Sequence, residues 1–289
     1  MRLFVIIPTY KRKELLSRVL EHLDHQTRSP DEVIVSAPDE THVEFCKPRR
    51  FGISYVFGKR GSCAQRNKAI EHALGRCDII TNFDDDYLPA DNYLELVEEA
   101  FTRHPDWTVL MGQAVANGSA NAGYTFEEGL ALLRQAERRE RTLQVSQHTG
   151  AYGCNMSFRT SQIGDLRFDE RLVLYGWLED IDFSCQLTGL APVVGMNTLL
   201  GVHLGAKTGR ENGVRLGYSQ VVNPIYLMRK GTVPAAFALE QMGRNIAANL
   251  IKSLWPEPYA DRRGRLKGNL LAASHLIRGR VEPEYILNL

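Results

Sequence analysis

Four short apolar segments alternate with helical patterns in the first hundred residues, and this alternation restricts the fold more than any other feature of the sequence. The segments 3–7, 31–36, 53–57 and 77–83 are rich in β-branched and other apolar residues, as strands of a buried sheet are. Apolar residues at helical spacing lie in 15–23, 61–75 and 91–103. This order predicts an α/β fold, with a mostly parallel sheet and helices on both faces.

The fourth apolar segment ends in three consecutive carboxylates, Asp84, Asp85 and Asp86. Adjacent carboxylates repel one another and lose solvation when they are packed together, so a fold avoids them unless a counter-charge is present. Asp oxygens are good ligands for Mg²⁺ or Mn²⁺, particularly when substrate phosphates complete the coordination. The triplet therefore suggests a metal site, and the alternative is a solvated acidic turn with Asp91 capping the next helix.

Polar loops also follow two other predicted strands, at 8–10 and at 36–39. In parallel sheets, ligands bind outside the carboxyl ends of the strands. Together with the Asp triplet, three polar loops are thus expected to meet at one edge of the sheet.

The bulk composition describes an ordinary globular protein. The chain has 289 residues, 44% of them hydrophobic and 24% charged, with a formal net charge of +1, so nothing suggests nucleic acid as a partner. No apolar run approaches the roughly 20 residues that cross a bilayer, and the apolar start stops at Pro8, too early for a signal peptide. The five scattered cysteines contain no CxxC pair and indicate reduced thiols. We therefore expect a cytoplasmic protein.

The second half of the chain is less regular. Strand-like segments are predicted at 107–115, 150–158 and 192–200, a charged helix at 126–141, and a helix that begins with the acidic residues 179–182.

From Pro224 onward, basic residues outnumber acidic ones and apolar residues lie between them at roughly helical spacing. Such basic amphipathic helices can lie at an anionic membrane surface, or they can pack on the main domain or on a partner subunit. The sequence does not decide between a monomer and an oligomer.

Several motifs resemble those of the glycosyltransferase family 2 enzymes. Residues 5–12 (VIIPTYKR) are similar to the family's opening V-x-I-P-T-Y-x-R, and 61–67 (GSCAQRN) to its G-x-x-x-A-R-N, with Gln65 in the usual Ala position. Asp84 to Asp86 resemble its D-x-D motif, 177–180 (WLED) its G-x-E-D pair, and His203 its late histidine. The order holds over about residues 3 to 205.

The resemblance implies a GT-A-type (Rossmann-like) domain in residues 1–223. Its nucleotide-binding half would cover about 1–115 and its acceptor half about 116–223, with a helical extension in 224–289. It also implies a metal-dependent, inverting enzyme that moves a sugar from a nucleotide-diphosphate donor to a hydroxyl of a glycan or lipid-linked acceptor. A place in surface polysaccharide synthesis, at the inner face of a membrane, is expected by analogy.

The same resemblance assigns roles to residues. Asp86 would hold Mn²⁺ or Mg²⁺, with His203 as a further ligand or a contact to the diphosphate, and Asp84 would contact the ribose or a metal-bound water. The bound ion would offset charge on the leaving diphosphate. The residues expected along the donor are Pro8, Thr9, Tyr10, Arg12, Asp39, Arg66, Asp84 and Asp85.

Asp180 is the expected general base for the acceptor hydroxyl, with Glu179 as the second choice. The alternative is a pair of acids that stabilise a helix dipole. Trp177 is expected to stack on an acceptor sugar, although it could also be a core residue.

One departure concerns the donor base. Family members often carry Asp-Asp-Gly-Ser after the second strand, where an Asp reads uracil, whereas residues 36–40 here read SAPDE. Asp39 is the nearest substitute, and guanosine and thymidine donors stay open.

Two rival functions stay open as well. A nucleotidyltransferase would share the sheet and the metal chemistry, but it usually has a Gly-rich loop after the first strand, where this chain has Pro8 to Tyr10. The second rival is a non-catalytic assembly subunit that binds a nucleotide or sugar.

Overall fold

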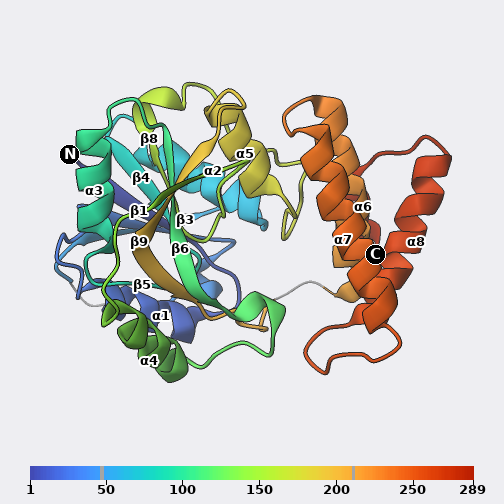
Figure 1. Ribbon diagram of the computed structural model, residues 1–289, viewed down its shortest axis with the longest axis horizontal. Coiled ribbons are helices and arrows are strands. Elements are labelled where there is room, and N and C mark those ends of the chain that lie inside the picture. Colours follow the sequence, from blue (N-terminus) through green and yellow to red (C-terminus); the bar gives the residue numbers. More distant parts are fainter. Residues whose placement is uncertain (46–48, 210–211) are drawn as a thin grey trace.

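The computed structural model describes residues 1–45, 49–209 and 212–289, so Cys46 lies outside the described residues. A sheet of nine strands, flanked by helices, stands beside a bundle formed by three C-terminal helices (Figure 1). The strands are β1 (Leu3–Pro8), β2 (Glu32–Ala37), β3 (Gly52–Phe57), β4 (Ile79–Asn82), β5 (Tyr87–Pro89), β6 (Val109–Asn117), β7 (Val145–His148), β8 (Met156–Arg159) and β9 (Val193–His203).

The sheet has the order β3-β2-β1-β4-β8-β6-β9-β5, and β7 pairs with β9. Strands β3, β2, β1 and β4 are parallel, as the alternation of strands and helices predicts. Strand β8 then runs antiparallel between β4 and β6, whereas β6 and β9 are parallel to each other. The carboxyl ends of β1, β2 and β4 therefore lie at one edge.

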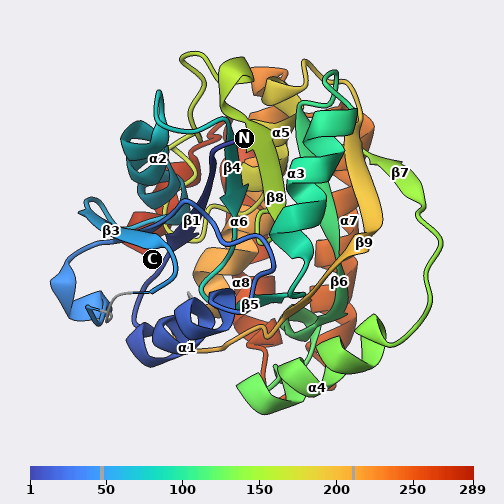
Figure 2. The same cartoon turned by 90° about the vertical axis from the view of Figure 1, so that its left-hand side faces the viewer.

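Helices cover both faces of the sheet (Figure 2). The helices of the main domain are α1 (Lys13–Leu23), α2 (Ser62–Ala73), α3 (Tyr93–Arg103), α4 (Phe126–Glu137) and α5 (Glu179–Leu187). Short 3₁₀ turns are η1 (Glu40–His42), η2 (Gly118–Ala120), η3 (Thr160–Gln162) and η4 (Pro283–Asn288). Along β1, Val5 faces the core beneath α1, whereas Phe4 and Ile6 face the core beneath α2. Both faces of β1 are buried, which explains its unbroken apolar sequence.

Two short strands were not predicted from the sequence. Strand β5 pairs with the end of β9, where Tyr87 lies opposite His203. Strand β7 is exposed at all four residues and pairs with the start of β9, so it has no apolar alternation to reveal it. The strand expected at 150–158 begins only at Met156, and the helix expected to reach residue 141 ends at Glu137.

The C-terminal bundle consists of α6 (Gly213–Lys230), α7 (Ala235–Lys252) and α8 (Arg262–Ile277). Pro224 lies inside α6, so the boundary expected at residue 224 falls within a helix. A proline in a helix interior removes one backbone hydrogen bond. Helix α6 nevertheless continues through Pro224, and it packs against both α7 and α8. Every helix in the described ranges is too short or too polar to span a lipid bilayer.

Candidate active site

A pocket of about 360 Å³ opens at the carboxyl ends of β1 and β4. The beginnings of α2 and α5 form further walls, and α7 contributes Phe237 and Gln241. Of the predicted site residues, those that line the pocket are Pro8, Thr9, Tyr10, Arg12, Arg66, Asp84, Asp85, Asp86, Trp177, Glu179, Asp180 and His203. Twelve of the predicted residues, from segments up to about 195 residues apart, therefore meet in one pocket.

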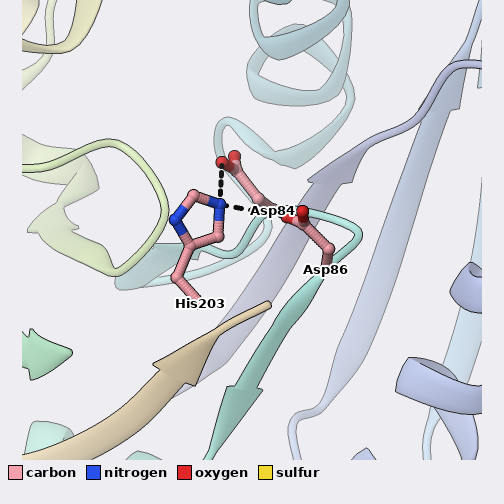
Figure 3. A group of neighbouring side chains, drawn as sticks. All are labelled: Asp84, Asp86 and His203. Atoms are coloured by element: carbon pink, nitrogen blue, oxygen red, sulfur yellow. Dashed lines mark ion pairs between the residues drawn. The ribbon is translucent and has the colours of Figure 1, made fainter. Parts of the chain in front are cut away.

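Asp84, Asp86 and His203 point toward one another in the pocket (Figure 3). The Nε2 atom of His203 lies 3.2 Å from Oδ1 of Asp86 and 3.9 Å from Oδ2 of Asp84. One ligand atom from each residue falls within 4.8 Å of the others. Their proximity follows from the sheet, because β9 ends at His203 opposite Tyr87, the residue after Asp86. Two carboxylate oxygens and an imidazole nitrogen make a suitable donor set for Mn²⁺ or Mg²⁺.

The two buried aspartates of the triplet have different surroundings. Burial would raise the pKa of Asp86, but the charges of His203 and Arg12 and a hydrogen bond from the Ala206 amide (2.7 Å) hold that pKa below its usual value. Burial raises the pKa of Asp85 to about 6, against the opposing effect of Arg12. Asp85 accepts hydrogen bonds from Thr9 Oγ1 and Arg12 Nη1, each at 2.7 Å, so it ties β1 to the loop after β4.

Arg66 is buried beneath the pocket and joins two acids. Its guanidinium pairs with Asp84 at 2.9 Å and, in a short contact, with Glu179. Burial opposes its charge, but the carboxylates of Glu179, Asp84 and Asp180 raise the pKa of Arg66 above its ordinary value. The metal-ligand cluster and the acidic pair at the start of α5 are thus connected by one fixed positive charge.

Glu179 and Asp180 begin α5 and both line the pocket. Burial raises the pKa of Glu179 to about 8, although Arg66 acts in the opposite direction. Burial also raises the pKa of Asp180, against hydrogen bonds from the amides of Gly153 (2.8 Å) and Ile181 (2.9 Å). A Cβ at position 153 would lie 3.0 Å from Asp180 Cβ, so glycine permits this close approach.

The loop before α5 brings two aromatic side chains to the pocket. Tyr175 and Trp177 stack with ring centroids 6.4 Å apart, and the indole Nε1 of Trp177 is buried without a hydrogen-bond partner in the structure as described. Leu174, Gly176 and Leu178 between and beside them all have positive φ, a costly conformation for the two leucines. Because every second residue from 174 to 178 has a left-handed backbone conformation, the segment cannot run as an extended strand. An aromatic platform with an unpaired N–H suits a sugar acceptor.

Asp39 is the one predicted site residue that does not line the pocket. It is exposed, and its carboxylate caps η1 by accepting hydrogen bonds from Thr41. Tyr10 instead occupies this side of the pocket, with Arg60 4.2 Å above its ring and His42 packed edge-on.

Other residues that line the pocket were not predicted, and three of them show why. The side-chain amide of Gln65 donates to the backbone carbonyls of Thr9 (2.8 Å) and Ser36 (2.7 Å), which fixes the ends of β1 and β2 against α2. Its unusual identity within the 61–67 motif was the available signal. Phe237 and Gln241 carry no local signal, because only the packing of α7 against the main domain brings them to the pocket.

Comparisons with known proteins agree with this geometry. Residues 4–165 match the model of a family described as glycosyl transferase family 2. Among solved structures, the chain is similar to the mannosyltransferase PcManGT from Pyrobaculum calidifontis in complex with GDP-Man and Mn²⁺, at 16% identity and a TM-score of 0.56 over 99% of this chain and 78% of that one. It is also similar to residues 1–349 of S. aureus TarS in complex with UDP-GlcNAc, at 14% identity and a TM-score of 0.54 over 97% of this chain and 93% of that one.

A comparison with curated protein sequences found no match. At these identities the structural likenesses show the fold. They confirm the expected α/β architecture of the GT-A type with a C-terminal helical part.

Proposed function

Since the chain belongs to glycosyl transferase family 2, we propose that it transfers a sugar from a nucleotide-diphosphate donor to a hydroxyl group of a glycan or lipid-linked acceptor, with inversion at the anomeric carbon. The observation that carries the proposal is the convergence of Asp84, Asp86 and His203 on the same pocket as Glu179 and Asp180. A metal-ligand set and an acidic pair in one pocket are what this reaction requires.

Asp86 and His203 would hold the divalent ion, with Asp84 as a third ligand or as a contact to the ribose. When bound, the ion supplies Lewis-acid stabilisation of the negative charge on the departing diphosphate. Arg12 reaches the same loop through Asp85 and adds a fixed positive charge near the expected position of the phosphates. Mn²⁺ in the complex of the archaeal mannosyltransferase supports this assignment.

We assign the general base to Asp180. The acceptor oxygen would attack the anomeric carbon from the face opposite the diphosphate, while its proton passes to the Asp180 carboxylate and the bond between sugar and diphosphate breaks. Asp180 is less buried than Glu179, and within the described residues it forms no ion pair, so it is better placed to receive a proton. Glu179 would hold Arg66 in position between the two acidic clusters.

The donor base is the least constrained part of the proposal. The solved structures that the chain resembles contain GDP-Man in one case and UDP-GlcNAc in the other. The exposed Asp39 already accepts two hydrogen bonds from Thr41, so its carboxylate is a poor reader of uracil. Arg60 lies over the Tyr10 ring and His42 packs edge-on against it, so a base would stack there on the tyrosine ring or on the guanidinium plane, and neither contact selects one base.

Calorimetric titration of UDP, GDP and dTDP with and without Mn²⁺ tests the proposal. One nucleotide should bind with micromolar affinity when Mn²⁺ is present and at least about tenfold more weakly without it. Asp86→Ala should lose the dependence on Mn²⁺, because a buried ligand oxygen is removed, whereas Asp165→Ala, an exposed site on the same domain, should behave as wild type.

If no nucleotide binds under any of these conditions, the proposed reaction is wrong. Release of pyrophosphate from a nucleoside triphosphate and a sugar phosphate would instead identify a nucleotidyltransferase. Once the nucleotide is known, its sugar conjugates can be screened against glycan and lipid-linked acceptors from surface polysaccharide pathways.

A further inference from the structure

One face of α7 is exposed along the whole helix and is mostly apolar. Exposed residues recur at 239, 243, 247, 250 and 254, a spacing of three to four residues that keeps them on one side of a helix. We call this the α7 outer face: its apolar members are Leu239, Gly243, Ala247, Leu250 and Ile251, and Leu254 continues it in the turn after the helix. The exposed Glu240 and Arg244 on the same side form an ion pair with each other.

The outer face becomes most apolar at the end of α7. Leu250, Ile251, Leu254 and Trp255 are between 56% and 75% exposed, and all four lie within residues 250–255. The turn that joins α7 to α8 projects from the bundle at its lower edge in Figure 1. Large apolar side chains that are exposed together in this way usually mark an interaction site.

Basic side chains lie next to this apolar tip. The Nε atom of Arg263, at the start of α8, donates to the carbonyl of Ser253 at 3.3 Å, so the first turn of α8 lies beside the tip. Lys267 is exposed one turn further along α8. Arg278 and Arg280 are exposed where α8 ends.

These cations add to a positive excess, because acidic side chains of the bundle are already paired. Glu257 pairs with Lys252 and Arg262, and Glu284 pairs with Arg171 of the main domain. No ion pair joins Arg263 or Lys267 to an acid within the ranges that the structure covers.

We propose that the α7 outer face and the basic start of α8 dock on an anionic lipid bilayer. An exposed apolar stripe beside basic residues is the arrangement that binds at the boundary between headgroups and acyl chains. Trp255 at the tip suits this boundary, since its ring is apolar and its indole N–H is polar. A second copy of the chain is a poorer occupant, because its own Arg263 and Lys267 would approach those of the first.

Docking in this way would bring the pocket near the lipid surface. Phe237 and Gln241 lie one turn apart on α7 and form a wall of the pocket, and α7 continues from Gln241 for about 17 Å to its end at Lys252, where the apolar tip begins. A lipid-linked acceptor held in the bilayer would then reach the pocket along α7. This consequence rests on the proposed function, whereas the binding to lipid does not.

Co-sedimentation of the purified full-length chain with vesicles tests the inference. The wild type should sediment with vesicles of phosphatidylcholine that contain about one third phosphatidylglycerol, and much less of it should sediment with vesicles of pure phosphatidylcholine. Ile251→Ser with Leu254→Ser should weaken binding to the anionic vesicles by at least about tenfold, since each buried aliphatic side chain contributes strongly to insertion. Arg263→Gln with Lys267→Gln should weaken it by about fivefold for each charge and reduce its sensitivity to salt.

Leu143→Ser is the matched control, because Leu143 is equally exposed on the main domain and should not affect binding. Donor hydrolysis in solution should be unchanged in the Ile251→Ser, Leu254→Ser protein, which separates loss of docking from loss of folding or of the active site. A shift of Trp255 fluorescence to shorter wavelength on addition of anionic vesicles, absent from Trp255→Phe, would support insertion of the tip. The inference is overturned if the wild type does not bind anionic vesicles. It is also overturned if light scattering shows that the wild type is a dimer and that the double variant Ile251→Ser, Leu254→Ser is a monomer.

Discussion

Glu179 and Asp180 are neighbours in sequence, but the protein surrounds them differently. Arg66 pairs with Glu179, whereas two backbone amides hold Asp180 at the pocket wall. At the residue scale, this difference supports the proposed assignment of a positioning role to Glu179 and of the general base to Asp180. The sequence could place both acids in the pocket by their motif, but it could not distinguish their roles, because the partners come from α2 and from the loop before β8.

The catalytic role proposed for Asp180 predicts a specific loss in Asp180→Asn. Its kcat should fall by about 10² to 10⁴, the usual contribution of a general base, while metal-dependent nucleotide binding is retained. Glu179→Gln should lower kcat less, because its amide oxygen can still accept from Arg66. Steady-state kinetics with calorimetry of the nucleotide would measure both effects. A larger loss in Glu179→Gln than in Asp180→Asn would exchange the two assignments.

The raised pKa of Glu179 predicts a pH dependence of stability. Its carboxyl group has a pKa of about 8 in the folded chain and about 4.3 when unfolded, so between these values the folded state binds more protons. The contribution of Glu179 to the free energy of unfolding should therefore fall as the pH rises from about 4.5 to 8. Urea unfolding at several pH values should show wild type losing stability relative to Glu179→Gln across this window, at up to about 1.4 kcal/mol per pH unit. The exposed variant Glu71→Gln should run parallel to wild type, and a constant difference between wild type and Glu179→Gln would contradict the prediction.

At the scale of elements, α5 is held from the C-terminal bundle. Lys230 at the end of α6 pairs with Asp169 at 2.7 Å and with Asp182 of α5 at 2.9 Å, and Thr232 also donates to Asp182. Asp182 is completely buried, so its charge depends on these partners. The position of the acidic pair is thus linked to a helix outside the residues that match the family model.

Lys230→Met tests this link. It should lower the free energy of unfolding by about 2 kcal/mol, less than for a fully buried pair because Lys230 is partly exposed. It should also lower kcat more than it raises KM for the donor, since α5 carries the proposed base and the donor contacts lie elsewhere. The double variant Lys230→Met, Asp182→Asn should regain part of the stability, because the completely buried charge of Asp182 is removed as well, while Asp169 keeps its hydrogen bond from Tyr226. If the double variant is no more stable than the single one, the pair does not act as described.

The elements also show where sequence reasoning succeeds. Strand β1 is apolar on both faces and could be predicted directly, and the helix of 61–67 could be predicted from its motif. Strand β7 could not, because all its residues are exposed and it exists only through pairing with β9. His203 could be assigned to the metal site by its motif, whereas its distance from Asp86 depends on the antiparallel pairing of β5 with β9.

At the scale of the whole molecule, the pocket joins two regions with different sequence signals. The candidate metal ligands and the residues expected along the donor come from segments with recognisable motifs, and these segments were predicted. The wall formed by Phe237 and Gln241 comes from a helix that showed only a basic amphipathic pattern. Such a pattern predicts a helix with two faces, but it does not say which neighbour each face meets.

Because Phe237 and Gln241 belong to α7, the shape of the pocket can evolve through mutations in that helix. Because α7 contributes to the pocket but supplies none of the metal-ligand cluster, mutations in the bundle can reshape one side of the pocket while Asp84, Asp86 and His203 stay fixed. The wall that α7 provides can therefore vary without a change in these three residues, whereas α6 of the same bundle is tied to α5 through Lys230. Under the proposed function, exchange of residues 235–252 among related chains should change the acceptor preference while metal-dependent nucleotide binding is kept.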